Sequence, residues 1–396
     1  MNAPVHPRDL SVEERIAPLF AGPHCDGWAD MAEVVSRKWM QRSRDRIHAA
    51  LEQAGETRLA SQWMPALAPR FSPWRPEFSM AARAAAAGHH VMAVLQHALA
   101  CDPGSGSFEL TAQCDREACL YLDGSLIPIR GECTLQVSAD RILLTSEGAQ
   151  RSFRLDRNVW TADRPEQLPG WECERQPGLA PRILISAALP SSQGVFPWPE
   201  QRVMRNLAQG RGPDGSDPPG CADIRAALEL LAAAAPGYRE WVAAAIDTIL
   251  VLHGESSSSS DYPGVVVLGA QASRLDACEA IVMQAAPQYF TRLVSIIELV
   301  EPGAEEIHYV PERRSYVTTR HLLAHAHEKA NLIAMLAKLA PECAEAQRRL
   351  ALREMQFAVE FGHPLRSARS LTPAGVEFWS SVQQLAAPAA RNPQSH

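Results

Sequence analysis

The densest group of ionisable side chains in the sequence lies between Thr319 and Lys329. If this stretch is helical, His321, His325 and Glu328 share one face, because residues three or four apart are neighbours on a helix. Two imidazoles and a carboxylate are suitable ligands for Fe(II) or Zn(II). The alternative is a polar helix face whose histidines bond to neighbours or to water. We favour this alternative, because one helix cannot surround a metal ion.

Further polar residues accompany this face. His327 lies on the same predicted helix, Arg320 lies at its start and Arg313 just before it. If a metal site exists, His308 or His363 could add a ligand to it. The candidate polar site therefore comprises His321, His325, His327, Glu328, Arg313 and Arg320.

The composition is that of a folded globular protein. The chain has 396 residues, of which 46% are hydrophobic and 21% charged, and this usage excludes wholesale disorder. The formal net charge of -7 argues against a nucleic-acid partner, which needs a basic surplus. No stretch approaches the roughly 18 uninterrupted apolar residues of a membrane span, and the first residues lack the pattern of a secretory signal. We therefore expect a cytoplasmic protein without a membrane partner.

Cysteine usage agrees with that compartment. The nine cysteines are scattered along the chain without a Cys-x-x-Cys pair, so neither a zinc site nor a disulfide framework is indicated. We expect reduced thiols, several of them buried.

The first half of the sequence changes from helical to β-rich. Apolar spacing predicts helices over 28–54, ending near Gly55, and over 78–100. Alternating runs over 107–160, separated by turn residues, predict an antiparallel meander of four or five short strands. The Pro-rich stretch 161–220 is expected to be irregular.

The second half is predicted to be mostly helical. A long Ala/Leu helix begins near 221, and a second helix is expected over 238–254. A buried strand follows over 265–270, and then a helix over 276–299 that is interrupted by Pro287. The remaining expectations are a loop over 302–316 and helices over 318–339, 341–361 and 373–386.

These elements predict an α+β fold, mostly α-helical, with a small antiparallel β-meander. We divide the chain into an N-terminal helical region, 1–106, a β-rich region with the irregular Pro-rich segment, 107–208, and a C-terminal helical domain, 221–396. One strand is expected inside the Pro-rich segment, near 182–189. The composition of 209–220 is that of a flexible linker.

Several stretches of the sequence follow one another in a recognisable order. They are residues 126–131 in the predicted meander, the serine-rich turn with 263–268, the helix 276–282, and the segments 309–314 and 322–327. Together they resemble the HExxH-motif peptide-modification proteins, a family of iron- and 2-oxoglutarate-dependent peptide β-hydroxylases from ribosomal-peptide (RiPP) pathways. The resemblance spans roughly residues 60–340 and implies a peptide substrate, with Fe(II) and 2-oxoglutarate as the family's cofactors.

The family's metal-binding motif is degenerate in this chain. The HExxH string falls on residues 283–287. Met283 and Pro287 stand where the two histidines would be, and Gln284 stands where the glutamate would be. Methionine is a poor ligand for a hard Fe(II) site, and Pro287 lacks an N–H and would bend the helix. The family's downstream histidine falls near Lys329. The resemblance therefore implies that the family metal site is dismantled here.

Two hypotheses of different classes follow. In the first, the protein is an accessory or pseudoenzyme member of a RiPP pathway, without a cofactor. It would bind a precursor peptide, a partner metalloenzyme in a hetero-oligomer, or both. In the second, it is an active mononuclear-iron peptide hydroxylase whose metal has moved to His321, His325 and Glu328. We favour the first, because the lost ligands remove the metal on which such chemistry rests.

Two structural expectations accompany the first hypothesis. Met283 and Pro287 should lie on a helix and face the protein interior, because both are apolar. The binding surface should be rich in the Trp and Arg side chains of 63–78 and 305–320, since such residues are favoured anchors. The alternative for the first of these stretches is that its aromatic residues, Trp63, Trp74 and Phe78, simply fill a core.

Overall fold

The computed structural model of the chain forms two compact units, each built from segments that are not contiguous in sequence. The helical unit contains residues 1–35, 222–245 and 271–396, and the sheet unit contains 36–221 and 246–270. The residues that the structure describes are 12–23, 38, 41, 44–55, 68–69, 81, 84–85, 88–102, 106–122, 125–156, 159–163, 171–174, 182–186, 221–246, 248–251, 256–258, 264–269, 271–304, 306–310 and 314–387.

The sheet unit contains a five-stranded antiparallel meander in which consecutive strands are neighbours. The predicted meander is therefore confirmed. Two runs that we expected as separate strands join into one long strand, with a break in register between Cys114 and Ala118. A bulge of this kind bends a strand without ending it. The strands are β3 (Ser107–Leu122), β4 (Ser125–Ser138), β5 (Arg141–Ser146), β6 (Ala149–Asp156) and β7 (Val159–Ala162).

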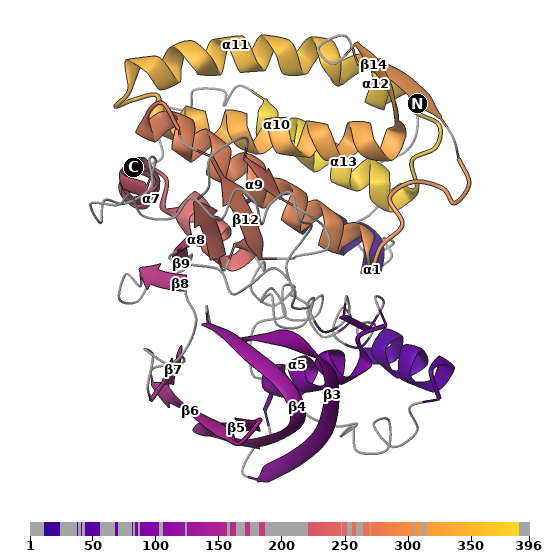
Figure 1. Ribbon diagram of the computed structural model, residues 1–396. Coiled ribbons are helices and arrows are strands. Elements are labelled where there is room, and N and C mark those ends of the chain that lie inside the picture. The colour runs from indigo at the N-terminus through magenta and orange to yellow at the C-terminus, as the bar shows by residue number, and fades with distance from the viewer. Residues whose placement is uncertain are drawn as a thin grey trace. The chain divides into compact units, whose positions relative to one another are not determined.

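The helix α5 (His90–Ala100) covers one face of this meander and packs against β3 and β4 (Figure 1). Its Gln96 side chain holds it there: Nε2 donates to the carbonyl of Tyr121, and Oε1 accepts from the Tyr121 N–H, both at 2.7 Å. The expected single helix over 78–100 is interrupted, because Gly88 adopts a left-handed backbone with φ +79°. Glycine takes this conformation at little cost and commonly ends helices.

A second sheet in this unit has the strand order β11-β12-β10-β9-β8, with β9, β10 and β12 parallel. The strands expected near 182–189 and 265–270 are confirmed as β9 and β12. The expected helix over 238–254 is wrong beyond Ala245, because Thr248–Val251 form β10. The residues of β10, one threonine and three aliphatic side chains, suit a strand in a parallel sheet. A run this short does not distinguish a strand from a helix in the sequence. The bounds are β8 (Trp171–Glu174), β9 (Arg182–Ser186), β10 (Thr248–Val251), β11 (Ser257–Ser258) and β12 (Val265–Leu268). Elsewhere in the unit the short strands β1 (Ala68–Pro69) and β2 (Cys101–Asp102) pair with each other.

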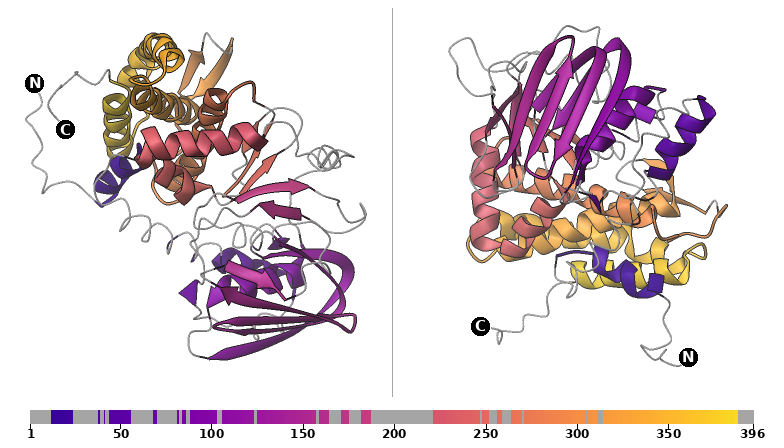
Figure 2. Two further views of the ribbon diagram at one scale, coloured as in Figure 1. Left: turned by 90° about the vertical axis from the view of Figure 1, so that its left-hand side faces the viewer. Right: turned by 90° about the horizontal axis from the view of Figure 1, so that it is seen from below.

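The helical unit is organised around α10, which packs against α9, α11 and α13 (Figures 1 and 2). A short N-terminal segment completes it, with the 3-10 helix η1 packed on α13. The bounds are α1 (Val12–Ile16), η1 (Ala17–Phe20), α7 (Cys221–Ala234), α8 (Pro236–Ala245), α9 (Arg274–Val294), α10 (Thr319–Leu339), α11 (Ala344–Glu360), α12 (Gly362–Ser367) and α13 (Pro373–Ala386).

Hydroxyl side chains cap the N-termini of α9, α10 and α13. Ser273 accepts a hydrogen bond from the N–H of Asp276 in α9, Thr318 accepts one from His321 in α10, and Thr372 accepts one from Gly375 in α13. Such caps satisfy N–H groups that have no partner within a helix. The start of α13 is also fixed by Gly375, where a Cβ would lie only 2.0 Å from the carbonyl oxygen of Leu299. Only glycine fits at this point.

Two expectations in this unit are corrected. Pro287 does not interrupt α9, which continues from Arg274 to Val294. Packing of α9 against α8 and α10 offsets the loss of the backbone hydrogen bond that proline, without an N–H, cannot donate. The expected loop over 302–316 contains an antiparallel hairpin of β13 (Ile307–Val310) and β14 (Ser315–Thr318). Four-residue strands lie at the limit of what alternation can signal.

The fold class is confirmed as α+β and mostly helical, with a small antiparallel sheet. The helices predicted over 318–339 and 373–386 are confirmed as α10 and α13, and Gly55, with φ +73°, follows the helix that covers 44–53. In the part of the chain that the structure describes, no helix combines the length and apolarity needed to cross a membrane. The linker 209–220 and the aromatic residues Trp63, Trp74 and Phe78 lie outside the described residues.

Candidate functional site

The polar face predicted on α10 exists only in part. His321 serves the start of the helix: Thr318 Oγ1 accepts from its backbone N–H and lies 2.9 Å from its ring Nδ1. One turn later, His325 Nδ1 lies 3.5 Å from Glu328 Oε2, with the side chains 20% and 13% exposed. The helix therefore brings His325 and Glu328 together, while His321 is held by the capping threonine.

This arrangement does not form a ready metal site. No group of three or more His, Cys, Asp or Glu side chains within the described residues is placed so that it could hold a metal ion. Of the two histidines proposed as further ligands, His308 bonds to Thr319 and His363 lies exposed on α12. A metal held by His321, His325 and Glu328 would require His321 to leave Thr318.

His327 lies elsewhere, in the core of the helical unit. Its side chain is fully buried among the rings of Trp241, Phe290 and Phe378, at centroid distances of 6.4, 6.3 and 5.4 Å. Burial lowers its pKa to about 4, although backbone groups of Phe20 and Ala21 favour the protonated form. A charged imidazolium is costly in such surroundings, so His327 is neutral near pH 7. It is not part of an exposed polar face.

A buried polar contact lies one turn further along α10. Asn331 Nδ2 donates to the carbonyl oxygens of Ala21, at 2.8 Å, and His327, at 2.9 Å. Its Oδ1 accepts from the hydroxyl of Tyr238 at 3.3 Å. Asn331 therefore fastens the N-terminal segment and α8 to the central helix, and it belongs to the packing of the unit.

The degenerate motif lies on α9 beside this core. Met283, Gln284 and Pro287 are half-buried, whereas Ala285 and Ala286 within the same string are fully buried. The expectation that Met283 and Pro287 face the interior is therefore not met. The fully buried residues of α9 are Ala277, Cys278, Ile281, Val282, Ala285, Ala286, Tyr289 and Leu293.

The hairpin of β13 and β14 divides its side chains sharply between two faces. Residues opposite each other in the ladder point to the same face, and the pairs are Ile307 with Thr318 and Tyr309 with Tyr316. Ile307, Tyr309 and Tyr316 are 60%, 50% and 75% exposed. The two tyrosine rings contact each other with centroids 5.3 Å apart. We call Ile307, Tyr309 and Tyr316 the aromatic face.

The opposite face of the hairpin is fixed by a chain of hydrogen bonds. His308 Nε2 lies 3.0 Å from Thr319 Oγ1, which lies 2.9 Å from the hydroxyl of Ser370. Ser370 in turn donates to Glu306 Oε2 at 2.8 Å, and the same oxygen accepts from the backbone N–H groups of Ser370 and Arg369. We call Glu306, His308, Thr319 and Ser370 the anchor chain.

Two members of the anchor chain are buried, with Thr319 and Ser370 only 1% and 6% exposed, and Glu306 and His308 are half-buried. Burial alone would raise the pKa of Glu306. The hydrogen bonds from Ser370 and Arg369, with the nearby charge of His308, lower it below its usual value. Glu306 is thus an ionised acceptor near pH 7, which strengthens its hydrogen bonds. The sequence does not predict this chain, because Ser370 is far in sequence from Glu306, His308 and Thr319 and meets them only in the fold.

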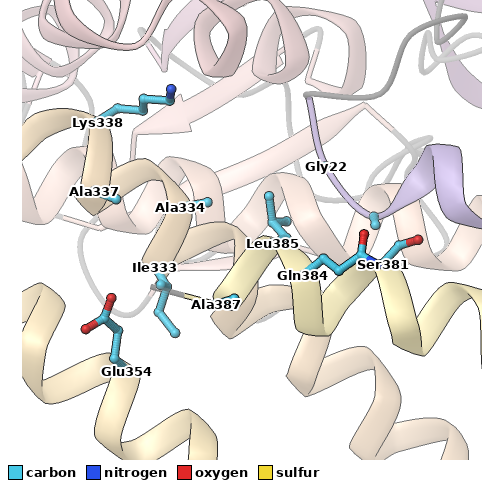
Figure 3. Close-up of a pocket in the computed structure, with 11 residues that line it drawn as sticks. Gly22, Ile333, Ala334, Ala337, Lys338, Glu354, Ser381, Gln384, Leu385 and Ala387 are labelled. Carbon is cyan, nitrogen blue, oxygen red and sulfur yellow. The ribbon is translucent and has the colours of Figure 1, made fainter. Parts of the chain in front are cut away.

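The surface of the helical unit has a hollow of about 400 Å³ between α10, α11, α13 and the N-terminal segment. Figure 3 shows Leu385 and Gln384 along α13, with Glu354 and Lys338 near its margins. Gly22 closes one side, where a Cβ would lie 2.7 Å from Leu385. The lining is mostly aliphatic and brings no pair of reactive groups together. It therefore offers no chemistry.

Two arginines complete the set of predicted site residues. Arg320 is exposed on the first turn of α10. Arg313 lies outside the described residues, in the connection between β13 and β14. Compared with known proteins, the chain matches no family model and no curated sequence.

Proposed function

We propose that the protein is an accessory member of a ribosomal-peptide modification pathway, which binds a precursor peptide or a partner modifying enzyme and carries no catalytic iron of its own. The aromatic face of the hairpin is the observation that carries the binding role. The degenerate motif at Met283, Gln284 and Pro287 supports the loss of the iron. We place the protein in the cytoplasm, where such peptides are made.

The aromatic face is suited to recognition because its position is fixed before binding. Solvent-facing positions of a hairpin are usually polar, yet here they carry Ile307, Tyr309 and Tyr316. Tyrosine combines a large apolar ring with a hydroxyl that tolerates water, and it is enriched at binding hot spots. The anchor chain holds the other face of the same strands. A partner would therefore not need to order this surface, which lowers the entropic cost of binding.

The alternative function is an active mononuclear-iron, 2-oxoglutarate-dependent peptide hydroxylase with its metal at His321, His325 and Glu328. The proximity of His325 and Glu328 favours it. The engagement of His321 by Thr318 disfavours it. Elemental analysis of the purified chain and of His325→Ala separates the two functions, because only the alternative expects iron or zinc that is lost in the variant.

The proposed function is tested by co-expressing the tagged chain with the short peptides and modifying enzymes encoded beside its gene. We expect at least one of them to be retained by the wild-type chain and to be lost with Tyr309→Ser/Tyr316→Ser. Retention of none of them, or equal retention by wild type and variant, would contradict the proposal. Met355→Ser is the matched control, since Met355 is another exposed hydrophobic residue, on α11.

A further inference from the structure

The N-terminal segment of the helical unit is separated from the next segment of that unit by residues 36–221, which belong to the sheet unit. We call residues 17–22 the strap. Three of its residues, Ala17, Phe20 and Ala21, are at most 2% exposed. The regular structure of the strap is limited to the four-residue 3-10 helix η1. Its position in the unit therefore depends mainly on the helices that surround it.

Side chains of the helical unit hold the strap at three points. The Phe20 ring packs edge-on against Tyr289 of α9, with centroids 6.5 Å apart. The carbonyl oxygen of Ala21 accepts a hydrogen bond of 2.8 Å from Asn331 Nδ2 of α10. At Gly22 a Cβ would lie 3.1 Å from Asn331 Oδ1 and 2.7 Å from a side chain of α13. The site therefore favours an aromatic residue followed by two small residues.

The strap and the hollow of about 400 Å³ belong to one groove between α10 and α13. Ala21 and Gly22, at the end of the strap, line the hollow (Figure 3). On α10, Asn331 contacts the strap, whereas Ala334 and Lys338 line the hollow. Residues at this spacing share one face of a helix. The strap therefore fills one end of the groove, and the hollow is the open end.

The residues that line the open end indicate the chemistry of an occupant. Most of them are alanine, glycine, isoleucine or leucine. The two charged residues, Lys338 and Glu354, have opposite signs, so the lining gives no preference for either charge. Burial of apolar side chains would supply most of the free energy of binding. The groove therefore suits a short apolar segment without a net charge.

Polar atoms beside the strap lie without hydrogen bonds. His327 and Trp241 are 0% and 2% exposed, and within the described residues neither ring nitrogen of His327 nor Nε1 of Trp241 has a hydrogen-bond partner. Backbone groups of Phe20 and Ala21 face the His327 ring, but not with the geometry of a hydrogen bond. Buried polar groups without partners cost free energy. An occupant that bonds to these atoms can therefore compete with the strap.

We propose that the strap is an intramolecular occupant of a peptide-binding groove between α10 and α13. A short apolar segment of another polypeptide, with an aromatic residue followed by two small residues, binds there in its place. The strap is thereby an autoinhibitory contact, because the inner end of the groove is closed until the strap leaves. The groove shares no residue with the aromatic face, so its binding role is separate from the proposed function.

The test uses the full chain and a labelled synthetic peptide with the sequence of residues 16–23, with both ends capped. Binding to wild type and to Phe20→Ser is followed by fluorescence anisotropy, since this variant weakens the strap and leaves the walls of the groove unchanged. We expect the peptide to bind Phe20→Ser at least about tenfold more tightly than wild type, because the strap competes less. The same peptide with serine in place of its phenylalanine should bind at least about tenfold more weakly. Equal affinity for the two chains, or of the two peptides, would overturn the proposal.

A milder variant decides the question if circular dichroism shows that Phe20→Ser does not fold. Gly22→Ala places a methyl group against Leu385 and Asn331, which loosens the strap and keeps its aromatic ring. It should bind the peptide severalfold more tightly than wild type, and unchanged affinity would overturn the proposal. Val376→Ser is the matched control, since Val376 is an exposed hydrophobic residue of α13 away from the hollow. It should bind the peptide as wild type does, and a gain equal to that of Gly22→Ala would also count against the groove.

The strap of a second copy of the chain is the other candidate occupant. Light scattering over a range of concentrations tests it, because exchange of a terminal segment between copies produces a dimer. We expect the wild-type chain to be monomeric at all concentrations. A dimer that the peptide dissociates would show that the strap binds in the groove of another copy, and it would overturn the intramolecular contact.

Discussion

Two aromatic regions of the helical unit carry similar side chains in opposite environments. In the core, Trp241 stacks on Tyr289 with ring centroids 4.4 Å apart, and both are almost fully buried beside His327. On the hairpin, Tyr309 and Tyr316 contact each other at 5.3 Å, yet half or more of each side chain is exposed. The core rings are enclosed by other side chains, whereas the hairpin rings expose apolar surface to solvent.

Polar residue type alone does not mark a functional site in this chain. His327 stands in the most polar stretch of the sequence, yet its ring is enclosed by aromatic residues and its pKa is lowered to about 4. The two strands of the hairpin carry no carboxylate, lysine or arginine, and their aromatic face is exposed to solvent. His321 and His327 therefore take part in helix capping and core packing, whereas the exposed apolar side chains lie on the hairpin that precedes their helix.

The largest effect that tests this comparison is expected from Trp241→Ala. Truncating a fully buried tryptophan removes hydrophobic burial and leaves a cavity, so the free energy of unfolding should fall by about 3–5 kcal/mol. Urea denaturation followed by far-UV circular dichroism measures it. Tyr316→Ser provides the matched measurement at the exposed region. A loss below about 1 kcal/mol for Trp241→Ala would show that this region is not the core of the unit.

The next effect concerns the free energy of unfolding at acid pH. Burial lowers the pKa of His327 to about 4 in the folded state, below the usual 6.5 of histidine, so the unfolded chain binds its proton at a higher pH than the folded chain does. Stability should therefore fall as the pH drops from about 6.5 towards 4, by about 3 kcal/mol for a fully buried group. Denaturation of His327→Gln across this range should show a smaller decline than wild type.

His97 in the sheet unit supplies the control for that measurement. Burial, with the nearby charge of Arg44, also lowers its pKa to about 4, so it should contribute a similar decline. His97→Gln should remove a similar part of the pH dependence, and the double variant should remove both parts, because the sites belong to different units. An unchanged pH dependence in His327→Gln would mean that this ring is protonated in the folded protein.

A smaller effect is expected at the anchor chain. Ser370→Ala removes the hydroxyl that joins Glu306 to Thr319 and should lower the free energy of unfolding by about 1–2 kcal/mol. It should also speed backbone amide exchange in 307–318, because the hairpin loses part of its attachment. Ser367→Ala is the control, since its hydroxyl bonds only within the end of α12. Equal exchange in the two variants would contradict the anchoring role.

The smallest effect on stability is expected at the aromatic face itself. Tyr316→Ser should change the free energy of unfolding by no more than about 0.5 kcal/mol, because its side chain is 75% exposed. Denaturation in urea again measures the change. A loss of more than about 2 kcal/mol would show that Tyr316 supports the fold, so that its exposure could not be explained by a binding role.

The long, strongly patterned elements could be predicted from the sequence, and the short ones could not. The meander over 107–160 and the helices α10 and α13 were predictable because many residues repeat one period. The sequence predicts a helix for Thr248–Val251, because one threonine and three aliphatic residues after an Ala-rich helix do not distinguish a buried strand from a continuation of the helix. The effect of Pro287 was also overestimated, since packing around α9 overrides a local cost.

The candidate site was predictable only where neighbours in sequence are neighbours in space. The pairing of His325 with Glu328 follows from helical spacing alone. The anchor chain could not be found in this way, because Glu306 and Ser370 are far apart in sequence and meet only through the fold. The interior position of His327 results from its packing against rings of α8, α9 and α13, which cannot be inferred from the sequence of α10 alone.

Hydrogen exchange of the full chain, alone and with the co-expressed peptide or partner bound, tests the central claim most directly. A bound peptide or partner would cover the aromatic face and shield the backbone of the hairpin from water. Slower amide exchange is therefore expected over 306–318 in the complex, with little change in the core around His327. Slower exchange elsewhere, with an unchanged hairpin, would contradict it.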